Sequence, residues 1–233
     1  MSPDFPIILL SGMGADERMF AKLRPLLPEV VVPEWIRPEP RETLREYARR
    51  MAAHVDPGRP CVVGGASFGG FLALEMLPYL RNAQACVLIG AVRSPAEFPP
   101  WIRWLKPVVP LLRVMPFQLF WWASGLIAAV IGPVLPRRMR EFLWLGSSLD
   151  PVFFRWAAAA VLTWGDDGPP PTPRVPVYHV QGARDRVLPA KRTTPTELVP
   201  RGGHVIALSN PRDVAGFIRR HLSPELAPAA ATA

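Results

Sequence analysis

The sequence contains little cysteine, histidine and lysine: two Cys, four His and three Lys among 233 residues. Two cysteines cannot build the framework of a small disulfide-bonded protein, and Cys61 and Cys86 each open a short apolar run. We therefore expect both thiols to be buried and reduced. No metal site is expected, because two isolated cysteines supply too few ligands. A reducing compartment is predicted from this use of cysteine.

Basic blocks and a targeting segment are also missing. The 27 Lys and Arg outnumber the 19 Asp and Glu, which gives a net charge of +8, but the arginines are scattered. No nucleic-acid-binding signature interrupts the apolar runs, so nucleic acid is not expected as a partner. The N-terminus has no basic region, and the apolar stretch Ile7–Leu10 is too short for a signal peptide. The predicted location is the cytoplasm.

Short apolar runs alternate with helical patterns along the chain. An apolar fraction of 49% excludes disorder and fits one globular domain. Continuous apolar runs that end in Gly or turn residues are typical of strands buried on both faces of a parallel sheet. The sequence therefore predicts a doubly wound α/β fold with a mostly parallel sheet, whose ligands bind beyond the carboxyl ends of the strands. The expected strands are 7–10, 30–32, 61–63, 86–89, 175–180 and 197–199, and the expected helices are 16–27, 43–54, 68–80 and 211–222.

The interval 94–173 breaks this rhythm, because it lacks a clear strand and is rich in Trp. It is too long for a bare loop, so we expect a helical insertion into a core formed by 1–93 and 174–222, with 223–233 as a disordered tail. Within it, Val114–Pro136 carries no charge and is long enough to cross a membrane. Pro and Gly interrupt this stretch, and a single crossing would divide the sheet. We expect an apolar cap helix and no transmembrane span, with contact at one membrane surface left open.

Gly65-Ala66-Ser67-Phe68-Gly69 lies between an expected strand and an expected helix, the context that a G-x-S-x-G nucleophile requires. The serine must occupy a sharp turn with strained backbone angles, and glycines two residues away let the strand and helix approach closely. This pattern predicts Ser67 as a nucleophile. A structural turn serine is the alternative.

A serine hydroxyl needs a general base that is oriented by an acid. His204 follows the last expected strand and precedes the closing helix, whereas the other histidines are poorly placed for catalysis. Asp185 follows the strand 175–180 and gives the chain order Ser, Asp, His, while Asp166 and Asp167 come before that strand. The sequence predicts a Ser67, Asp185 and His204 triad.

These motifs make the chain similar to the α/β-hydrolases, in particular to small microbial serine esterases that include carboxylesterases and pimeloyl carrier-protein methyl ester esterases. The resemblance implies a sheet of about six strands, with the family's first two strands missing. It implies the same triad and an oxyanion hole formed by the backbone N–H groups of Met13 and Phe68. This chain has Ser11-Gly12 where the family commonly has His-Gly. How the oxyanion loop is supported is therefore an open question.

The insertion then corresponds to the cap that covers the active site in this family. Its aromatic residues are expected to line the substrate pocket, namely Trp101, Trp121, Trp122, Trp144 and Phe153. The interval 93–164 carries eight cationic and three anionic side chains, which form either a solvated face or a docking surface for an anionic carrier or lipid headgroup.

The motifs and the resemblance together predict a serine hydrolase that cleaves carboxylic esters of a mainly apolar, short-to-medium acyl chain, without a metal or organic cofactor. A thioesterase or acyltransferase with the same triad, a membrane-associating lipase and a catalytically silent binding protein remain alternatives.

Overall fold

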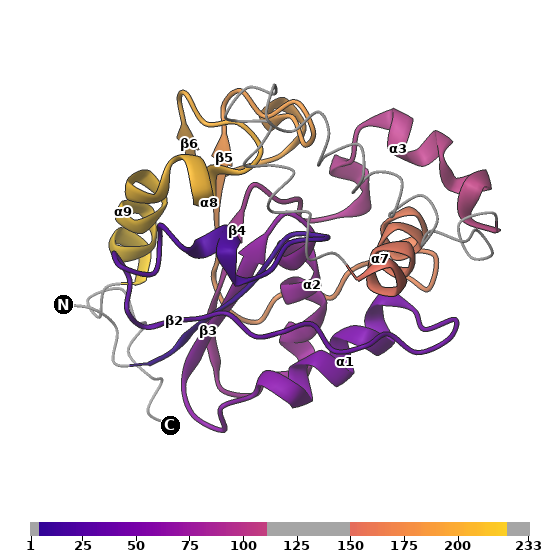
Figure 1. Ribbon diagram of the computed structural model, residues 1–233, viewed down its shortest axis with the longest axis horizontal. Coiled ribbons are helices and arrows are strands. Elements are labelled where there is room, and N and C mark those ends of the chain that lie inside the picture. The colour runs from indigo at the N-terminus through magenta and orange to yellow at the C-terminus, as the bar shows by residue number, and fades with distance from the viewer. Residues whose placement is uncertain (1–4, 111–149, 223–233) are drawn as a thin grey trace, which may run out of the picture.

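Six parallel strands form the centre of the protein in the computed structural model, which describes residues 5–110 and 150–222 (Figure 1). The strands lie in the order β2-β1-β3-β4-β5-β6, and every neighbouring pair is parallel. The predicted doubly wound α/β fold is confirmed. Their bounds are β1 (Ile7–Leu10), β2 (Val30–Val31), β3 (Cys61–Ala66), β4 (Ala83–Ile89), β5 (Val177–Gly182) and β6 (Glu197–Val199).

The central strands are buried on both faces, as their continuous apolar sequences predict. Alternate side chains of one strand point to opposite faces, so Val62 joins the core on one side of the sheet and Val63 the core on the other. Helices α1 (Leu44–Val55) and α2 (Phe68–Met76) cover one face, and α8 (Ile206–Ser209) and α9 (Pro211–Leu222) cover the other (Figure 1).

Local sequence explains where the helices begin and how they pack. Thr43 caps α1 through a capping box, in which its hydroxyl accepts from the Glu46 N–H and the Glu46 carboxylate accepts from the Thr43 N–H. By contrast, α2 is buried along its whole length and has no polar face. Because α2 starts directly after β3, the turn between them is flanked by a buried strand and a buried helix, and Ser67 itself stays partly exposed.

The predicted helix over 16–27 is wrong in form. Only a short 3₁₀ helix (Glu17–Phe20) forms there, followed by turns through Leu26. Pro25 supplies no N–H and its ring obstructs a continuing helix, which explains why the apolar spacing of this segment does not produce one. Four of its apolar side chains, Met19, Phe20, Leu23 and Leu27, are nevertheless buried in the core. The burial pattern was therefore predictable where the backbone form was not.

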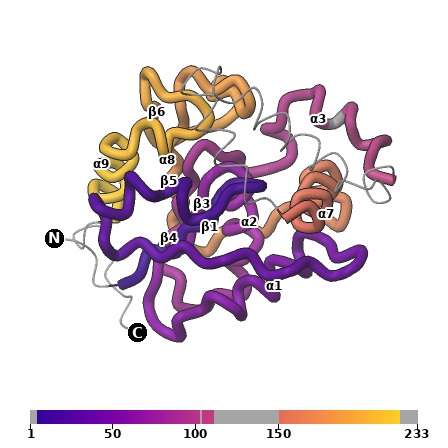
Figure 2. The backbone as a smooth tube through the Cα atoms, viewed as in Figure 1, coloured from indigo at the N-terminus to yellow at the C-terminus, as the bar shows by residue number. Residues whose placement is uncertain are grey.

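Between β4 and β5 the chain leaves the sheet, passes through α3 (Pro100–Trp104) and returns through α7 (Pro151–Thr163), a path that Figure 2 traces. Two indole N–H groups anchor α7 and its end to the core: Trp156 donates to the Glu42 carbonyl at 2.8 Å, and Trp164 donates to the Glu75 carboxylate at 2.8 Å. Glu75 is almost completely buried and also pairs with Arg45. These contacts fix α7 beside α1 and α2.

The residues outside 5–110 and 150–222 include several that the sequence singled out. Trp121, Trp122, Trp144, the uncharged stretch Val114–Pro136 and the tail 223–233 all lie outside the described residues. Within the described ranges, none of the helices has the length and apolarity needed to span a bilayer.

Candidate active site

The order in which strands are added to the sheet reverses between β1 and β3. The chain proceeds from β1 to β2 at one edge and then places β3 on the other side of β1. In open α/β sheets such a switch point leaves a crevice beyond the carboxyl ends of the two strands, where ligands bind. Ser11 and Ser67 directly follow these two ends, so the predicted oxyanion loop and the predicted nucleophile meet at this crevice.

Ser67 has φ 50° and ψ −116°, a conformation that L-residues rarely adopt. The glycines around it permit this turn. A Cβ at Gly69 would collide with the backbone oxygens of Leu10 and Ser11, and one at Gly65 would lie 2.6 Å from the Leu10 oxygen. The turn therefore packs directly against the end of β1, which only glycine at both positions allows.

The three predicted polar residues form one hydrogen-bonded chain. His204 Nε2 lies 3.0 Å from Ser67 Oγ, and His204 Nδ1 lies 2.8 Å from Asp185 Oδ2. An ionised carboxylate only accepts hydrogen bonds, so Nδ1 carries the ring hydrogen and Nε2 is free to accept the serine proton. In this arrangement the imidazole can act as a general base toward Ser67.

Asp185 is buried and held by more than the histidine. Its Oδ1 accepts the backbone N–H groups of Val187 and Leu188 at 2.8 and 2.9 Å. Its Oδ2 accepts the Gln181 side-chain amide at 2.9 Å as well as His204. A buried charge without partners is costly, and these four donors compensate for the lost water.

The loop that carries His204 packs closely against the sheet. A Cβ on Gly182 would collide with the backbone oxygens of Gly202 and Gly203. Gly90, which has φ 58°, would place a Cβ 2.8 Å from the His204 oxygen. Glycines at the ends of β4 and β5 thus let the histidine loop approach the strand ends, and they set the depth at which the imidazole lies.

The predicted oxyanion donors, Met13 and Phe68, flank the same crevice, and in the described part of the chain neither N–H donates to another protein group. The loop is held without the histidine common in similar sequences. Buried Ser11 donates its hydroxyl to the Ala15 carbonyl at 2.7 Å, and the Trp35 indole donates to the same oxygen at 3.2 Å. These two bonds support the oxyanion loop in a chain that has Ser11-Gly12 where similar sequences have His-Gly.

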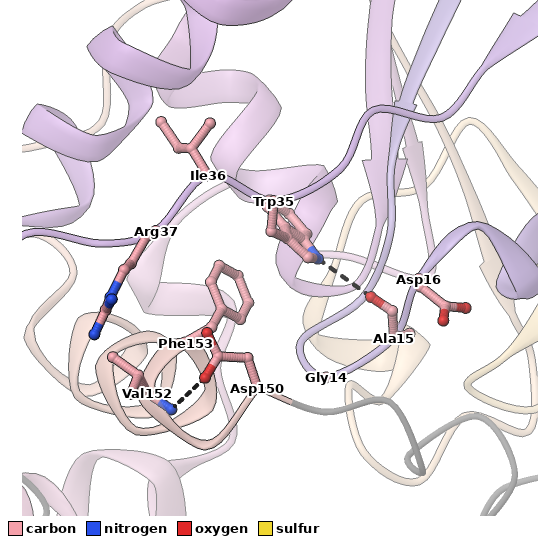
Figure 3. A pocket seen from close by; sticks show the side chains of 9 residues that line it. All are labelled: Gly14, Ala15, Asp16, Trp35, Ile36, Arg37, Asp150, Val152 and Phe153. Carbon is pink, nitrogen blue, oxygen red and sulfur yellow. Dashed lines mark hydrogen bonds between the residues drawn. The ribbon is translucent and has the colours of Figure 1, made fainter.

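A cavity of about 450 Å³ adjoins the oxyanion loop (Figure 3). Trp35 and Phe153 line it with their rings stacked at a centroid separation of 4.8 Å, and the Trp35 ring also contacts Phe68 edge-on at 5.7 Å. Phe153 was predicted in the pocket, whereas Trp101 is half exposed on α3 and is not among the lining residues. The described residues that line it are Gly14, Ala15, Asp16, Trp35, Ile36, Arg37, Asp150, Val152 and Phe153.

The cavity lining combines apolar side chains with the charged side chains of Asp16, Arg37 and Asp150. Asp16 is paired with Arg18, and Asp150 accepts the Val152 N–H at the start of α7. Both carboxylates are therefore already engaged in holding local structure.

The described ranges hold no cluster of three or more His, Cys, Asp or Glu side chains that could bind a metal ion. Cys61 and Cys86 are free and buried. Burial raises the pKa of the Cys61 thiol to about 11 and that of Cys86 to about 12, which keeps both thiols protonated and unreactive at neutral pH.

Sequence reasoning missed Ser11 and Trp35 as supports of the oxyanion loop and Gln181 as a partner of Asp185. Trp35 stands apart from the other seven tryptophans, all within 93–173, and follows a strand end, which could have marked it. Gln181 interrupts the apolar pattern of β5. A polar residue inside a strand that the apolar pattern predicts to be buried indicates that its side chain has a buried hydrogen-bond partner. Ser11 is marked only as a departure from the His-Gly common in similar sequences, and that departure does not indicate its partner.

Comparison with known proteins concerns the family and the fold. A profile described as the alpha/beta hydrolase family matches residues 7–217. No curated protein matches the chain in sequence.

Among solved structures, a hydrolase from Pseudomonas aeruginosa superposes with a TM-score of 0.68 at 15% identity, over 96% of this chain and 92% of the other. A thermophilic esterase from Thermogutta terrifontis has a TM-score of 0.66 at 20% identity, over 95% and 90%. An enol-lactonase from Burkholderia xenovorans has a TM-score of 0.63 at 13% identity, over 93% and 92%. At these identities the likeness concerns the fold.

Proposed function

The chain belongs to the α/β-hydrolase family, and we propose that it is a serine hydrolase that cleaves carboxylic esters through an acyl-enzyme intermediate. The observation that carries this proposal is the hydrogen-bonded chain from Ser67 through His204 to Asp185, with Ser67 in a strained turn. Strain of this kind is stored where a side chain must be presented for reaction.

In the proposed reaction His204 Nε2 accepts the Ser67 proton while Oγ forms a bond to the ester carbonyl carbon. The bond to the alcohol oxygen then breaks, and the imidazolium returns its proton to the departing alcohol. Water repeats the sequence on the acyl-enzyme and releases the acid. The N–H groups of Met13 and Phe68 would stabilise the negative oxygen of both tetrahedral intermediates, and one such donor is typically worth roughly 10²–10³ in rate.

The cavity beside the oxyanion loop supports a mainly apolar, short-to-medium acyl chain. Its volume of about 450 Å³ lies within the range of ~300–1,000 Å³ that is typical for small-molecule sites. Neither Ser67 nor the two oxyanion donors are among the described lining residues, but Trp35 contacts Phe68 and Gly14 follows Met13, so the cavity lies next to the oxyanion loop. We propose that the acyl chain extends into this space. Each buried methylene would contribute ~0.8 kcal/mol until the cavity is full.

A series of p-nitrophenyl esters from acetate to palmitate tests both parts of the proposal. We expect kcat/KM to rise with chain length to an optimum at short or medium chains and Ser67→Ala to abolish hydrolysis without unfolding the protein. A Ser67→Ala variant that retains more than a few per cent of wild-type activity would refute the nucleophile. A steady fall from acetate upward would refute the acyl pocket, and matched thioesters turned over faster than oxyesters would favour a thioesterase.

A membrane-associating lipase is the second candidate, and one observation favours it. Four exposed apolar side chains lie on α3 and on the turn and short 3₁₀ helix (Lys106–Val108) that follow it. They are Trp101, Trp104, Leu105 and Val108. Activity that appears only above the micellar threshold of the substrate, and that Trp104→Ser abolishes, would support this candidate. Equal activity on dissolved and aggregated esters would refute it.

The expected docking of an anionic carrier or lipid headgroup rests on Arg137, Arg138 and Arg140, which lie outside the described residues. Replacing the three by Gln should leave turnover of a small neutral ester unchanged. A loss restricted to anionic substrates would identify a docking surface, and no loss with any substrate would assign them to a solvated face.

A further inference from the structure

Strand β5 carries two fully buried polar side chains, His179 and Gln181, on the same face. Residues two apart in a strand share a face, and the intervening Val180 belongs to the apolar core on the other side. Burying an amide and an imidazole is costly unless both are hydrogen-bonded. The partners of these side chains lead to the active site.

The hydrogen bonds of Gln181 determine which way its amide points. Its Nε2 lies 2.9 Å from Asp185 Oδ2 and 2.6 Å from the Leu188 carbonyl oxygen, and both of these atoms are acceptors. The NH₂ group must therefore face them, which leaves Oε1 toward His179 Nε2 at 3.0 Å. Because Oε1 only accepts, His179 carries a hydrogen on Nε2 and donates it to Gln181.

In this arrangement each oxygen of the Asp185 carboxylate accepts two hydrogen bonds. Val187 and Leu188 donate to Oδ1, and Gln181 and His204 donate to Oδ2. Rotation of the carboxylate would break at least two of these bonds. With Gln181 replaced by an apolar side chain, Oδ2 would retain only His204, and the carboxylate could tilt away from the direction that the imidazole requires.

We propose that Gln181, oriented by the hydrogen bond from His179, is a positioning residue that fixes the carboxylate of Asp185 toward His204. The proposal rests on the proposed serine-hydrolase function and adds two residues to it. Neither side chain contacts the substrate, because both are fully buried in the sheet below the strand ends. Their effect should therefore appear in the rate of the chemical steps and not in substrate binding.

The test compares two substitutions of Gln181. Gln181→Met retains the length of the side chain and removes the donor, and we expect kcat to fall about tenfold, the factor that corresponds to ~1.4 kcal/mol, with KM unchanged. Gln181→Glu replaces the donor by an acceptor that faces the Asp185 carboxylate, so its loss at pH 8 should be larger. Either variant keeping wild-type kcat would overturn the proposal.

A second pair of variants tests the role of His179. His179→Gln retains a side-chain N–H donor near the position of Nε2 and should keep most of the wild-type kcat. His179→Leu removes the donor and should lower kcat in the same direction as Gln181→Met. Equal kcat in the two His179 variants would overturn the assignment of His179, and this pair also provides a test if a Gln181 variant fails to fold.

Titration with a fluorophosphonate distinguishes a slower reaction at every folded site from a smaller fraction of correctly folded protein. We expect each variant to bind one equivalent of probe but to react more slowly, because every molecule contains a Ser67 with a poorly oriented base. The matched control is Val180→Ala, on the opposite face of β5, which should lower the melting temperature and leave kcat unchanged. A reduced number of reactive sites that accounts for the whole loss of activity would overturn the proposal.

The same titration distinguishes failure of this inference from failure of the proposed function. A wild-type protein that neither hydrolyses esters nor reacts with the probe would refute the serine-hydrolase function. A reactive wild-type protein whose Gln181 and His179 variants react at the same rate would refute only the positioning role.

Discussion

Acid should destabilise this protein through His179. Burial lowers the pKa of His179 from its ordinary value of 6.5 to about 4, and the nearby positive charge of Arg93 acts in the same direction. The unfolded chain therefore takes up a proton near pH 6.5, whereas the folded protein does so only near pH 4. The stability contributed by the neutral imidazole is fully present above pH 6.5 and is lost as the pH falls toward 4.

The size of the effect follows from the two pKa values. Linkage gives a loss of about 2 kcal/mol in the free energy of unfolding between pH 7.5 and pH 5, and about 3 kcal/mol by pH 4. Carboxylates also titrate in this range, so the quantity to measure is the difference between wild type and His179→Gln, in which their contributions cancel. Urea unfolding at the two pH values gives this difference directly.

The expected outcome is that His179→Gln gains about 2 kcal/mol relative to wild type on going from pH 7.5 to pH 5. Val180→Ala is the control, because it removes apolar packing at the adjacent position and should cost the same free energy at both pH values. A difference between wild type and His179→Gln that does not change with pH would refute the reasoning, since it would show that His179 is not held neutral by the fold.

Three further predictions concern the acid, the oxyanion loop and the attachment of α7. Asp185→Asn should lower kcat by roughly 10⁴, because the imidazole then loses the tautomer that accepts the serine proton, whereas Asp166→Asn should leave kcat unchanged. If steady-state assays show the larger loss for Asp166→Asn, the assignment of Asp185 as the acid is wrong. Ser11→Ala should lower kcat about tenfold with little change in melting temperature, by loosening the loop that ends in the Met13 N–H, and unchanged kcat would mean that Trp35 alone holds the loop. Trp164→Phe should cost about 1–3 kcal/mol of unfolding free energy, measured in urea, because it leaves the buried Glu75 carboxylate with one partner fewer; a neutral result would show that Arg45 is sufficient.

The sheet could be predicted from the sequence because its strands are buried on both faces. Continuous apolar runs such as 61–63 and 86–89 have few other stable arrangements, and the glycines that follow them mark the strand ends. The same logic located Ser67, whose motif has meaning only between a strand and a helix. Periodicity worked less well over 16–27, where proline prevented the helix that the apolar spacing indicated.

The sequence marks Trp35 and Gln181 as unusual, but it does not show which groups they bond, for a physical reason. Hydrogen bonds such as Trp35 to Ala15 and Gln181 to Asp185 depend on which loops meet at the sheet edge, and no local pattern encodes that meeting. The cavity posed the same difficulty. Its aromatic lining was expected from the Trp-rich insertion. Among the described residues that line it, however, Trp35 comes from the segment after β2, and Phe153 is the one aromatic side chain from the insertion.

The four loops of the candidate site, which carry Ser67, His204, the oxyanion donors and Asp185, are held by two different means, and this difference predicts where substitutions are tolerated. Backbone approach with no room for a Cβ positions Ser67 and His204, so substitutions at Gly69 or Gly182 should prevent correct folding of the site. Side-chain hydrogen bonds position the oxyanion loop and Asp185. Each of these bonds can be removed without a steric clash, so variants of Ser11 and Gln181 should fold and lose rate in measured steps. Substitutions at the hydrogen-bonding supports should therefore change the reaction rate by degrees, whereas substitutions at the glycines should abolish the site.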